Sequence, residues 1–106
     1  MPSIEQLTKL LSADPADTFV LYALAQEHAK AGDHDQAIDL YRRCIAEDEA
    51  YCYAYFHGAR SLEALDRATE AAEMLETGLA VAERVGDAKA SSEIAQYRGS
   101  LDPGTG

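Results

Sequence analysis

Three histidines and two cysteines are the residues of this 106-residue chain best suited to bind a metal ion or to act in acid–base chemistry. None of His28, His34 and His57 has a histidine, cysteine or carboxylate four residues away, the spacing that places two ligands on one helix face. Cys44 and Cys52 are eight residues apart, which is no known zinc spacing, and two cysteines do not make a disulfide framework. We therefore expect ordinary surface or core side chains at all of these positions, and no bound metal.

Carboxylates are the other groups that could take part in catalysis, and they recur along one predicted helix. The acidic residues of this helix are Glu70, Glu73, Glu76 and Glu83. Their spacing is typical of a solvated outer face rather than a carboxylate site. The chain has no Gly-x-Ser-x-Gly nucleophile motif and no glycine-rich phosphate loop. The sequence therefore predicts a protein that is not an enzyme and that needs no cofactor.

The charge of the chain excludes two classes of partner. Nineteen acidic residues against nine basic ones leave a net charge of −10, which would repel nucleic acid and acidic membranes. This acidic, lysine-poor composition is typical of a solubilising surface, and a second interpretation is adaptation to a salt-rich cytoplasm, where repulsion is screened. No apolar run approaches the roughly 18 residues of a membrane span, and the first residues do not resemble a secretory signal. We expect a cytoplasmic location.

The stretch from Leu21 to Cys44 predicts two helices joined by a tight turn. Spacings of three and four place these residues on one face of the first helix: Leu21, Leu24, Ala25 and His28. The second helix has its own stripe: Ala37, Ile38, Tyr41, Cys44 and Ile45. Gly32 is expected to end the first helix in a left-handed conformation, and Asp33 or Asp35 to cap the second.

This stretch resembles the tetratricopeptide (TPR) repeat, a helix–turn–helix unit of about 34 residues with a W-x₂-L-G-x₂-Y, A-x₃-F, P pattern. The residues at the positions of this pattern are Leu21, Leu24, Ala25, His28, Ala37, Tyr41 and Glu49. The match is good at the small and apolar positions and loose where the pattern has Trp, Tyr and Pro.

A shift of about 34 residues, one repeat length, returns buried-type residues in register. Forward, the shift reaches Tyr55, Ala59, Leu62, Ala71, Ala72, Leu75, Gly78 and Leu79, and all but Gly78 are of a buried type. Backward, it reaches Ile4, Leu7, Leu10 and Leu11. Register kept over three passes favours an all-α, TPR-like stack of about six antiparallel helices, and the resemblance implies that this stack is a right-handed superhelix. Within it, Ala25 should lie close to Ala37, and Ala59 to Ala71.

We expect a single TPR-like domain over residues 1–102, followed by a tail at 103–106. Its parts are a half-repeat helix at 3–12, a first repeat at 17–48 (helices 17–31 and 35–48), a second repeat at 51–85 (helices 51–65 and 68–85) and a C-terminal capping helix at 88–99. The last helix is polar, as the end of a solenoid requires.

Local signals mark the helix ends and two internal glycines. Ser3 and Gln6 are expected to form a capping box, and Asp66 or Thr69 to cap the helix that starts at 68. Gly86-Asp87 repeats the Gly32-Asp33 signal. Gly58 and Gly78 interrupt predicted helices, so we expect bulky neighbours to fill the space above them, with the segment around Tyr55 covering Gly58.

Aromatic residues recur at matched positions of the two repeats, where Phe19 pairs with Tyr53 and Tyr22 with Phe56. In TPR proteins the first helix of each pair lines a concave groove, so the resemblance implies a binding surface. The inner residues are Phe19, Tyr22, Gln26, Lys30, Tyr53, Phe56, Arg60 and Glu63. This set is less acidic than the whole chain and suits a peptide with apolar anchors and an acidic group. The other interpretation is that these rings only pack helix on helix.

The resemblance implies a non-catalytic protein–protein interaction module that binds a peptide or partner helix of unknown identity. The family's carboxylate clamp, which grips chaperone tails, uses Lys and Asn where this chain has Tyr22, Gln26 and Arg60, so a chaperone tail is not the expected ligand. Two alternatives stay open. One is a homo-oligomer formed through the apolar face of the N-terminal helix, and the other is a regulatory domain of a larger enzyme.

Overall fold

The computed structural model describes residues 2–101, which form six helices and no strand. The helices are α1 (Ile4–Ala13), α2 (Thr18–Lys30), α3 (His34–Glu47), α4 (Cys52–Ala64), α5 (Ala68–Val85) and α6 (Ala88–Ser100). Each begins and ends within one residue of its predicted span. The tail expected at 103–106 lies outside the described residues. None of the six helices is long and apolar enough to cross a membrane.

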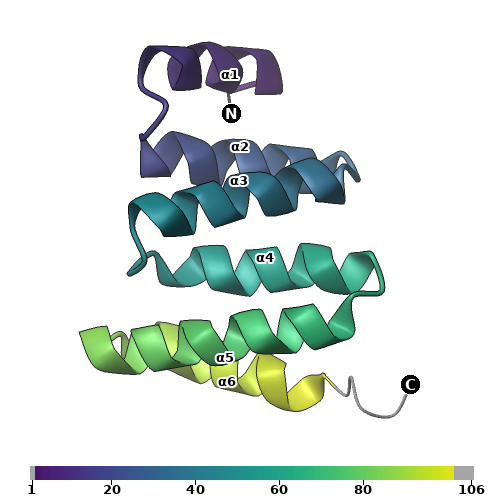
Figure 1. Ribbon diagram of the computed structural model, residues 1–106, viewed down its shortest axis with the longest axis vertical. Coiled ribbons are helices and arrows are strands. Elements are labelled where there is room, and N and C mark those ends of the chain that lie inside the picture. The colour runs from purple at the N-terminus through teal and green to yellow at the C-terminus, as the bar shows by residue number, and fades with distance from the viewer. Residues whose placement is uncertain (1, 102–106) are drawn as a thin grey trace.

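The helices follow one another in space in the order of the sequence. Figure 1 shows a stack that runs from α1 at one end to α5 and α6 at the other, and every consecutive pair is in contact. In addition, α2 contacts α4 and α4 contacts α6, so the alternate helices form one layer of their own. The predicted linear stack is therefore confirmed, and this layer is the frame on which the candidate site lies.

Two buried clusters form the core, one centred on α2 and α3 and the other on α4, α5 and α6. Ala25 and Ala37 are fully buried in the first cluster, and Ala59 and Ala71 in the second. Side chains this small let two helix axes approach closely.

The ends of the helices follow the local signals in part. Ser3 and Gln6 form the predicted capping box through bonds of 2.9 and 3.1 Å. Gly32 and Gly86 have φ values of 83° and 77°, the left-handed conformation that ends a helix and that glycine adopts without strain. Asp66 takes the same conformation, with φ 60°, at the matched turn of the second pair.

The predicted caps of α3 and α5 are wrong. Asp33 is the N-cap residue of α3 but accepts no capping hydrogen bond, because its carboxylate lies 3.5 Å from the His28 ring instead. Arg67 occupies the N-cap position of α5, and its guanidinium binds Glu70. The left-handed Asp66 therefore ends α4 rather than capping α5. Asp87 does cap α6, by accepting a hydrogen bond of 3.0 Å from the Ala90 amide.

Gly58 and Gly78 are both buried by bulky neighbours, as predicted, but the neighbours differ from the expectation. A Cβ added to Gly58 would lie 2.7 Å from the Met74 sulfur, whereas a Cβ added to Gly78 would lie 2.5 Å from the Tyr55 Cβ. The segment around Tyr55 therefore covers Gly78, because the side chain of Tyr55 points across to α5 and not along its own helix.

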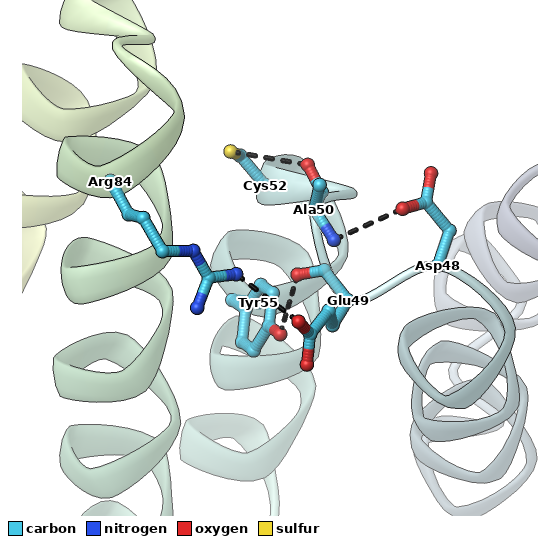
Figure 2. Close-up of polar contacts among 6 residues, drawn as sticks. All are labelled: Asp48, Glu49, Ala50, Cys52, Tyr55 and Arg84. Carbon is cyan, nitrogen blue, oxygen red and sulfur yellow. Dashed lines mark hydrogen bonds and ion pairs between the residues drawn. The ribbon is translucent and has the colours of Figure 1, made fainter.

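The connection between α3 and α4 is held by contacts to both following helices (Figure 2). The Tyr55 hydroxyl donates a hydrogen bond of 2.8 Å to the carbonyl of Glu49, and the Glu49 carboxylate lies 3.2 Å from the Arg84 guanidinium. The Asp48 carboxylate accepts a hydrogen bond of 3.1 Å from the Ala50 amide. These contacts hold the connection in place where the repeat pattern would have a proline.

Most of the apolar face of α1 is buried, whereas a homo-oligomer formed through this face requires it to be open. Leu7 and Leu11 are buried in the cluster that α1 shares with α2, and Ile4 is partly buried against it. Only Leu10 stays largely exposed, at 53%. Three of the four large apolar residues of α1 therefore pack in the cluster shared with α2, which leaves Leu10 as the main apolar surface for a second copy.

Candidate functional site

Three adjoining cavities lie along the layer of α2, α4 and α6. The N-terminal slot, about 200 Å³, lies between α1 and α2 and is lined by Pro2, Leu7, Phe19, Tyr22, Ala23, Gln26, Glu27 and Lys30. The central cavity, about 390 Å³, is lined by Gln26, Ala29, Lys30, His34, Tyr41, His57, Arg60, Ser61 and Ala64. The C-terminal cavity, about 320 Å³, is lined by Phe56, Arg60, Glu93, Gln96, Tyr97 and Ser100.

Shared residues join these cavities into one groove. Gln26 and Lys30 line both the N-terminal slot and the central cavity, and Arg60 lines both the central and the C-terminal cavity. We call the three cavities together the groove. It crosses the stack from α1 to α6, as the layer of alternate helices requires.

Six of the eight predicted site residues line the groove: Phe19, Tyr22, Gln26, Lys30, Phe56 and Arg60. The other two do not line these cavities. Tyr53 packs edge-on against Phe56, at 6.3 Å between ring centroids. Glu63 accepts a hydrogen bond of 2.6 Å from the Tyr97 hydroxyl, which fastens α6 to α4.

The aromatic residues of the groove divide into packed rings and an exposed one. The ring centroid of Tyr22 lies 4.9 Å from that of Tyr51 and 6.0 Å from that of Tyr41. Burial, and then the neighbouring Tyr51, raise the pKa of Tyr22 to about 12. Phe56 lies 5.2 Å from Tyr97. Phe19, in contrast, is 70% exposed. Most of these rings therefore pack helix on helix, while Phe19 offers its face to solvent at the end of the groove.

Arg60 is the cation of the groove that has no acidic partner within residues 2–101. Its guanidinium makes neither an ion pair nor a hydrogen bond there, whereas the Lys30 ammonium lies 3.0 Å from Glu27. Four other arginines form ion pairs: Arg42–Glu70, Arg67–Glu70, Arg84–Glu49 and Arg98–Glu76. Arg43 on α3 is therefore the second arginine without an ion pair in the described chain. An unpaired guanidinium in a groove is available to an anionic ligand.

Polar side chains from three helices surround Arg60. Burial, and then the charge of Arg60, lower the pKa of His57 below its usual value. The side-chain oxygen of Gln26 (Oε1) accepts a hydrogen bond from the Tyr41 hydroxyl, and burial raises the pKa of this hydroxyl. His34 and the buried Ser61 share a hydrogen bond of 3.1 Å.

Two sets of groove residues were missing from the sequence prediction. His34, His57 and Ser61 belong to the central cavity, and although His57 and Ser61 are four residues apart on α4, His34 is 27 residues from Ser61, which concealed that all three meet. The second set lies on α6, which we expected to be only a polar cap. Its members are Glu93, Gln96, Tyr97 and Ser100. Their spacing of three, four and seven residues is that of one helix face, and this signal could have identified them.

The cysteines and histidines form no metal-binding cluster in the described part of the chain. No group of three or more His, Cys, Asp or Glu side chains among residues 2–101 is arranged to hold a metal ion. Cys44 and Cys52 are buried free thiols, and burial raises the pKa of Cys44 to about 11.

Comparisons with known proteins place this geometry among TPR domains, although no family model matches the chain. The TPR repeat-containing protein PA0015 of Pseudomonas aeruginosa is 27% identical over 99 residues, which are 93% of this chain and 94% of that protein. The NMR structure of a tetratricopeptide repeat domain protein from Salinibacter ruber is 35% identical, with a TM-score of 0.74 over 80% of this chain and 86% of that one. The TPR2B domain of yeast Sti1, solved in a complex with pHsp70, shares the fold at 23% identity, with a TM-score of 0.83 over 90% of this chain and 78% of that one.

Proposed function

The chain belongs to the tetratricopeptide repeat family, and from this premise we propose that it is a non-catalytic protein–protein interaction module. The domain consists of a half repeat (α1), two full repeats (α2–α3 and α4–α5) and a capping helix (α6). Its ligand is a peptide or a partner helix that binds along the groove. The cytoplasmic location stays a prediction.

The observation on which this proposal rests is the continuity of the groove around Arg60. Three adjoining cavities offer room for an extended ligand, and Arg60 stands between two of them with no acidic partner in the described chain. Exposed Phe19 at one end and Phe56 near the other supply apolar contacts. Aromatic and arginine side chains of this kind most often dominate the binding energy of an interface.

The Sti1 domain was solved in a complex with pHsp70, but it is only 23% identical to this chain, which shows the fold alone. Where the family's clamp has Lys and Asn, this chain has Tyr22 packed among other rings and Gln26 engaged by Tyr41. We therefore do not propose a chaperone tail as the ligand. We also do not propose self-association through α1, because most of its apolar face is buried against α2 and only Leu10 stays largely exposed.

The test is selection of a displayed random-peptide library on the purified protein, followed by affinity measurements on groove variants. Phe19→Ala and Arg60→Gln alter exposed side chains and should weaken binding by about tenfold or more while leaving the thermal midpoint nearly unchanged. Tyr22→Ala is a poor probe, because Tyr22 packs against neighbouring rings and its loss would destabilise the fold.

Two matched variants outside the groove serve as controls. Val85→Ala removes an apolar side chain of α5 that is 49% exposed, and Arg43→Gln removes the other unpaired arginine. Both should bind the selected peptides as the parent protein does. If the control variants lose as much affinity as the groove variants, or if neither pair loses any, the groove is not the binding surface.

A further inference from the structure

The central cavity has a different charge character from the rest of the protein. None of its nine lining residues is acidic, although the chain has 19 acids and nine bases. Lys30, Arg60 and two histidines enter it from three helices. A single cavity without carboxylates on a protein of net charge −10 concentrates the attraction for anions at one place.

The hydrogen-bonding groups around this cavity are mainly donors. The guanidinium of Arg60 has no partner within residues 2–101, and the Gln26 side chain, whose oxygen accepts from Tyr41, keeps its amide NH₂ to donate. The Lys30 ammonium binds Glu27 with one hydrogen and has two more. His57, which makes no hydrogen bond to the described residues, adds a ring N–H. Several donors that converge on one space match a group with several acceptor oxygens.

We propose that the central cavity is a subsite for the phosphoryl group of a phosphorylated side chain, carried by a peptide that lies along the groove. A phosphoryl group has three acceptor oxygens and nearly two negative charges at neutral pH, so it can use Arg60 in a bidentate pair together with the other donors. A single carboxylate has one charge and two oxygens, and it would leave part of this donor set unused. The residues flanking the phosphorylated one would then lie in the N-terminal slot and the C-terminal cavity.

This inference rests on the proposed function, and its first test uses inorganic phosphate alone. In a titration of the isotope-labelled protein followed by NMR, phosphate should cause saturable shifts of the Arg60 side-chain N–H and of the His57 ring. Acetate at the same ionic strength should not. Arg60→Gln should weaken phosphate binding by about tenfold or more, whereas Arg43→Gln should not change it. Equal responses to phosphate and acetate, or an equal loss in both arginine variants, would overturn the subsite.

The second test uses oriented peptide libraries that contain phosphoserine, phosphothreonine or phosphotyrosine at one position, each with an unphosphorylated twin. Phosphorylated members should bind at least about tenfold more tightly than their twins, and Arg60→Gln should abolish this difference while Phe19→Ala weakens both forms. If peptides need Phe19 but are indifferent to phosphorylation, the groove stands and the phosphoryl subsite is overturned. If inorganic phosphate binds but no phosphorylated peptide does, the inferred peptide ligand is wrong.

Discussion

Tyr55 on α4 occupies the space above Gly78 on α5, so closely that a β-carbon added to Gly78 would lie 2.5 Å from the Tyr55 Cβ and 2.8 Å from its Cγ. The hydroxyl at the other end of this side chain binds the carbonyl of Glu49. Tyr55 is therefore held at both ends, and the two helices of the second repeat meet where one of them has no side chain. Glycine is the residue that permits this approach.

The two helical glycines should respond differently to alanine. In Gly78→Ala the new methyl group would clash with the Cβ and Cγ atoms of Tyr55, which cannot move unless the backbone of α4 moves. We therefore expect a loss of about 1–3 kcal/mol in the free energy of unfolding. In Gly58→Ala the close neighbour is the sulfur of Met74, the far part of a flexible side chain, and the better helix propensity of alanine offsets the contact. Urea denaturation followed by circular dichroism measures both, and equal losses would contradict this account.

Asp87 and Asp33 are the N-cap residues of α6 and α3 and form a controlled pair. Asp87→Ala should lower the free energy of unfolding by about 1 kcal/mol, because it removes the capping bond to the Ala90 amide. Asp33→Ala removes no capping bond and only an exposed contact with His28, so we expect a change within about 0.5 kcal/mol. Thermal and urea unfolding of the two variants would decide. A larger loss in Asp33→Ala would show that it caps α3 in solution.

His57 should make stability depend on pH on the acidic side of neutrality. Burial and Arg60 lower its pKa below 6.5, against the opposing charge of Glu93, so the unfolded chain binds more protons than the folded one just below pH 6.5. The contribution of His57 to the free energy of unfolding is therefore fully present above pH 6.5. This contribution is lost as the pH falls from 6.5 through the lower pKa of His57 in the folded protein. In His57→Gln this part of the pH dependence should disappear, as urea titrations from about pH 5 to pH 8 would show. An unchanged pH profile would contradict the lowered pKa.

The two cysteines should be unreactive in the folded protein. Both thiols are buried, and the pKa of Cys44, at about 11, leaves almost no thiolate near neutral pH. We expect reaction with a thiol reagent at about pH 8 to be limited by unfolding, and both cysteines to react at once in denaturant. Mass spectrometry of labelled peptides measures this. Rapid labelling of native Cys44 would indicate that α2 and α3 separate more easily than their packing suggests.

Salt should stabilise the protein if repulsion among its acidic residues opposes folding. With a net charge of −10, we expect the thermal midpoint to rise from low to molar sodium chloride as screening weakens this repulsion. A double variant, Glu73→Gln with Glu83→Gln, removes two exposed acids of α5 and should show a smaller rise. A midpoint that does not rise with salt would count against adaptation to a salt-rich cytoplasm.

Much of the fold could be predicted because its signals are local or periodic. Helix limits followed from glycine, proline and the apolar stripes, and the order of the helices followed from a repeat in which each unit contacts only its neighbours. Six of the eight proposed groove residues line the groove for the same reason, since the first helix of each pair presents the same face. Tyr53 and Glu63 do not, because their side chains are used in contacts with Phe56 and Tyr97.

By itself, then, the sequence determined the class of fold, the number and order of the helices and the face on which a groove forms. Only the tertiary structure decided which side chain crosses to which helix. Register along one chain does not specify how far one helix is displaced along another, so the sequence predicts that the segment around Tyr55 covers Gly58, whereas Tyr55 lies against Gly78. The same reason applies to Asp33, which turns to His28, and to the side chains of three helices that meet around Arg60. Contacts between helices depend on packing distances and rotamers, which no single helix encodes alone.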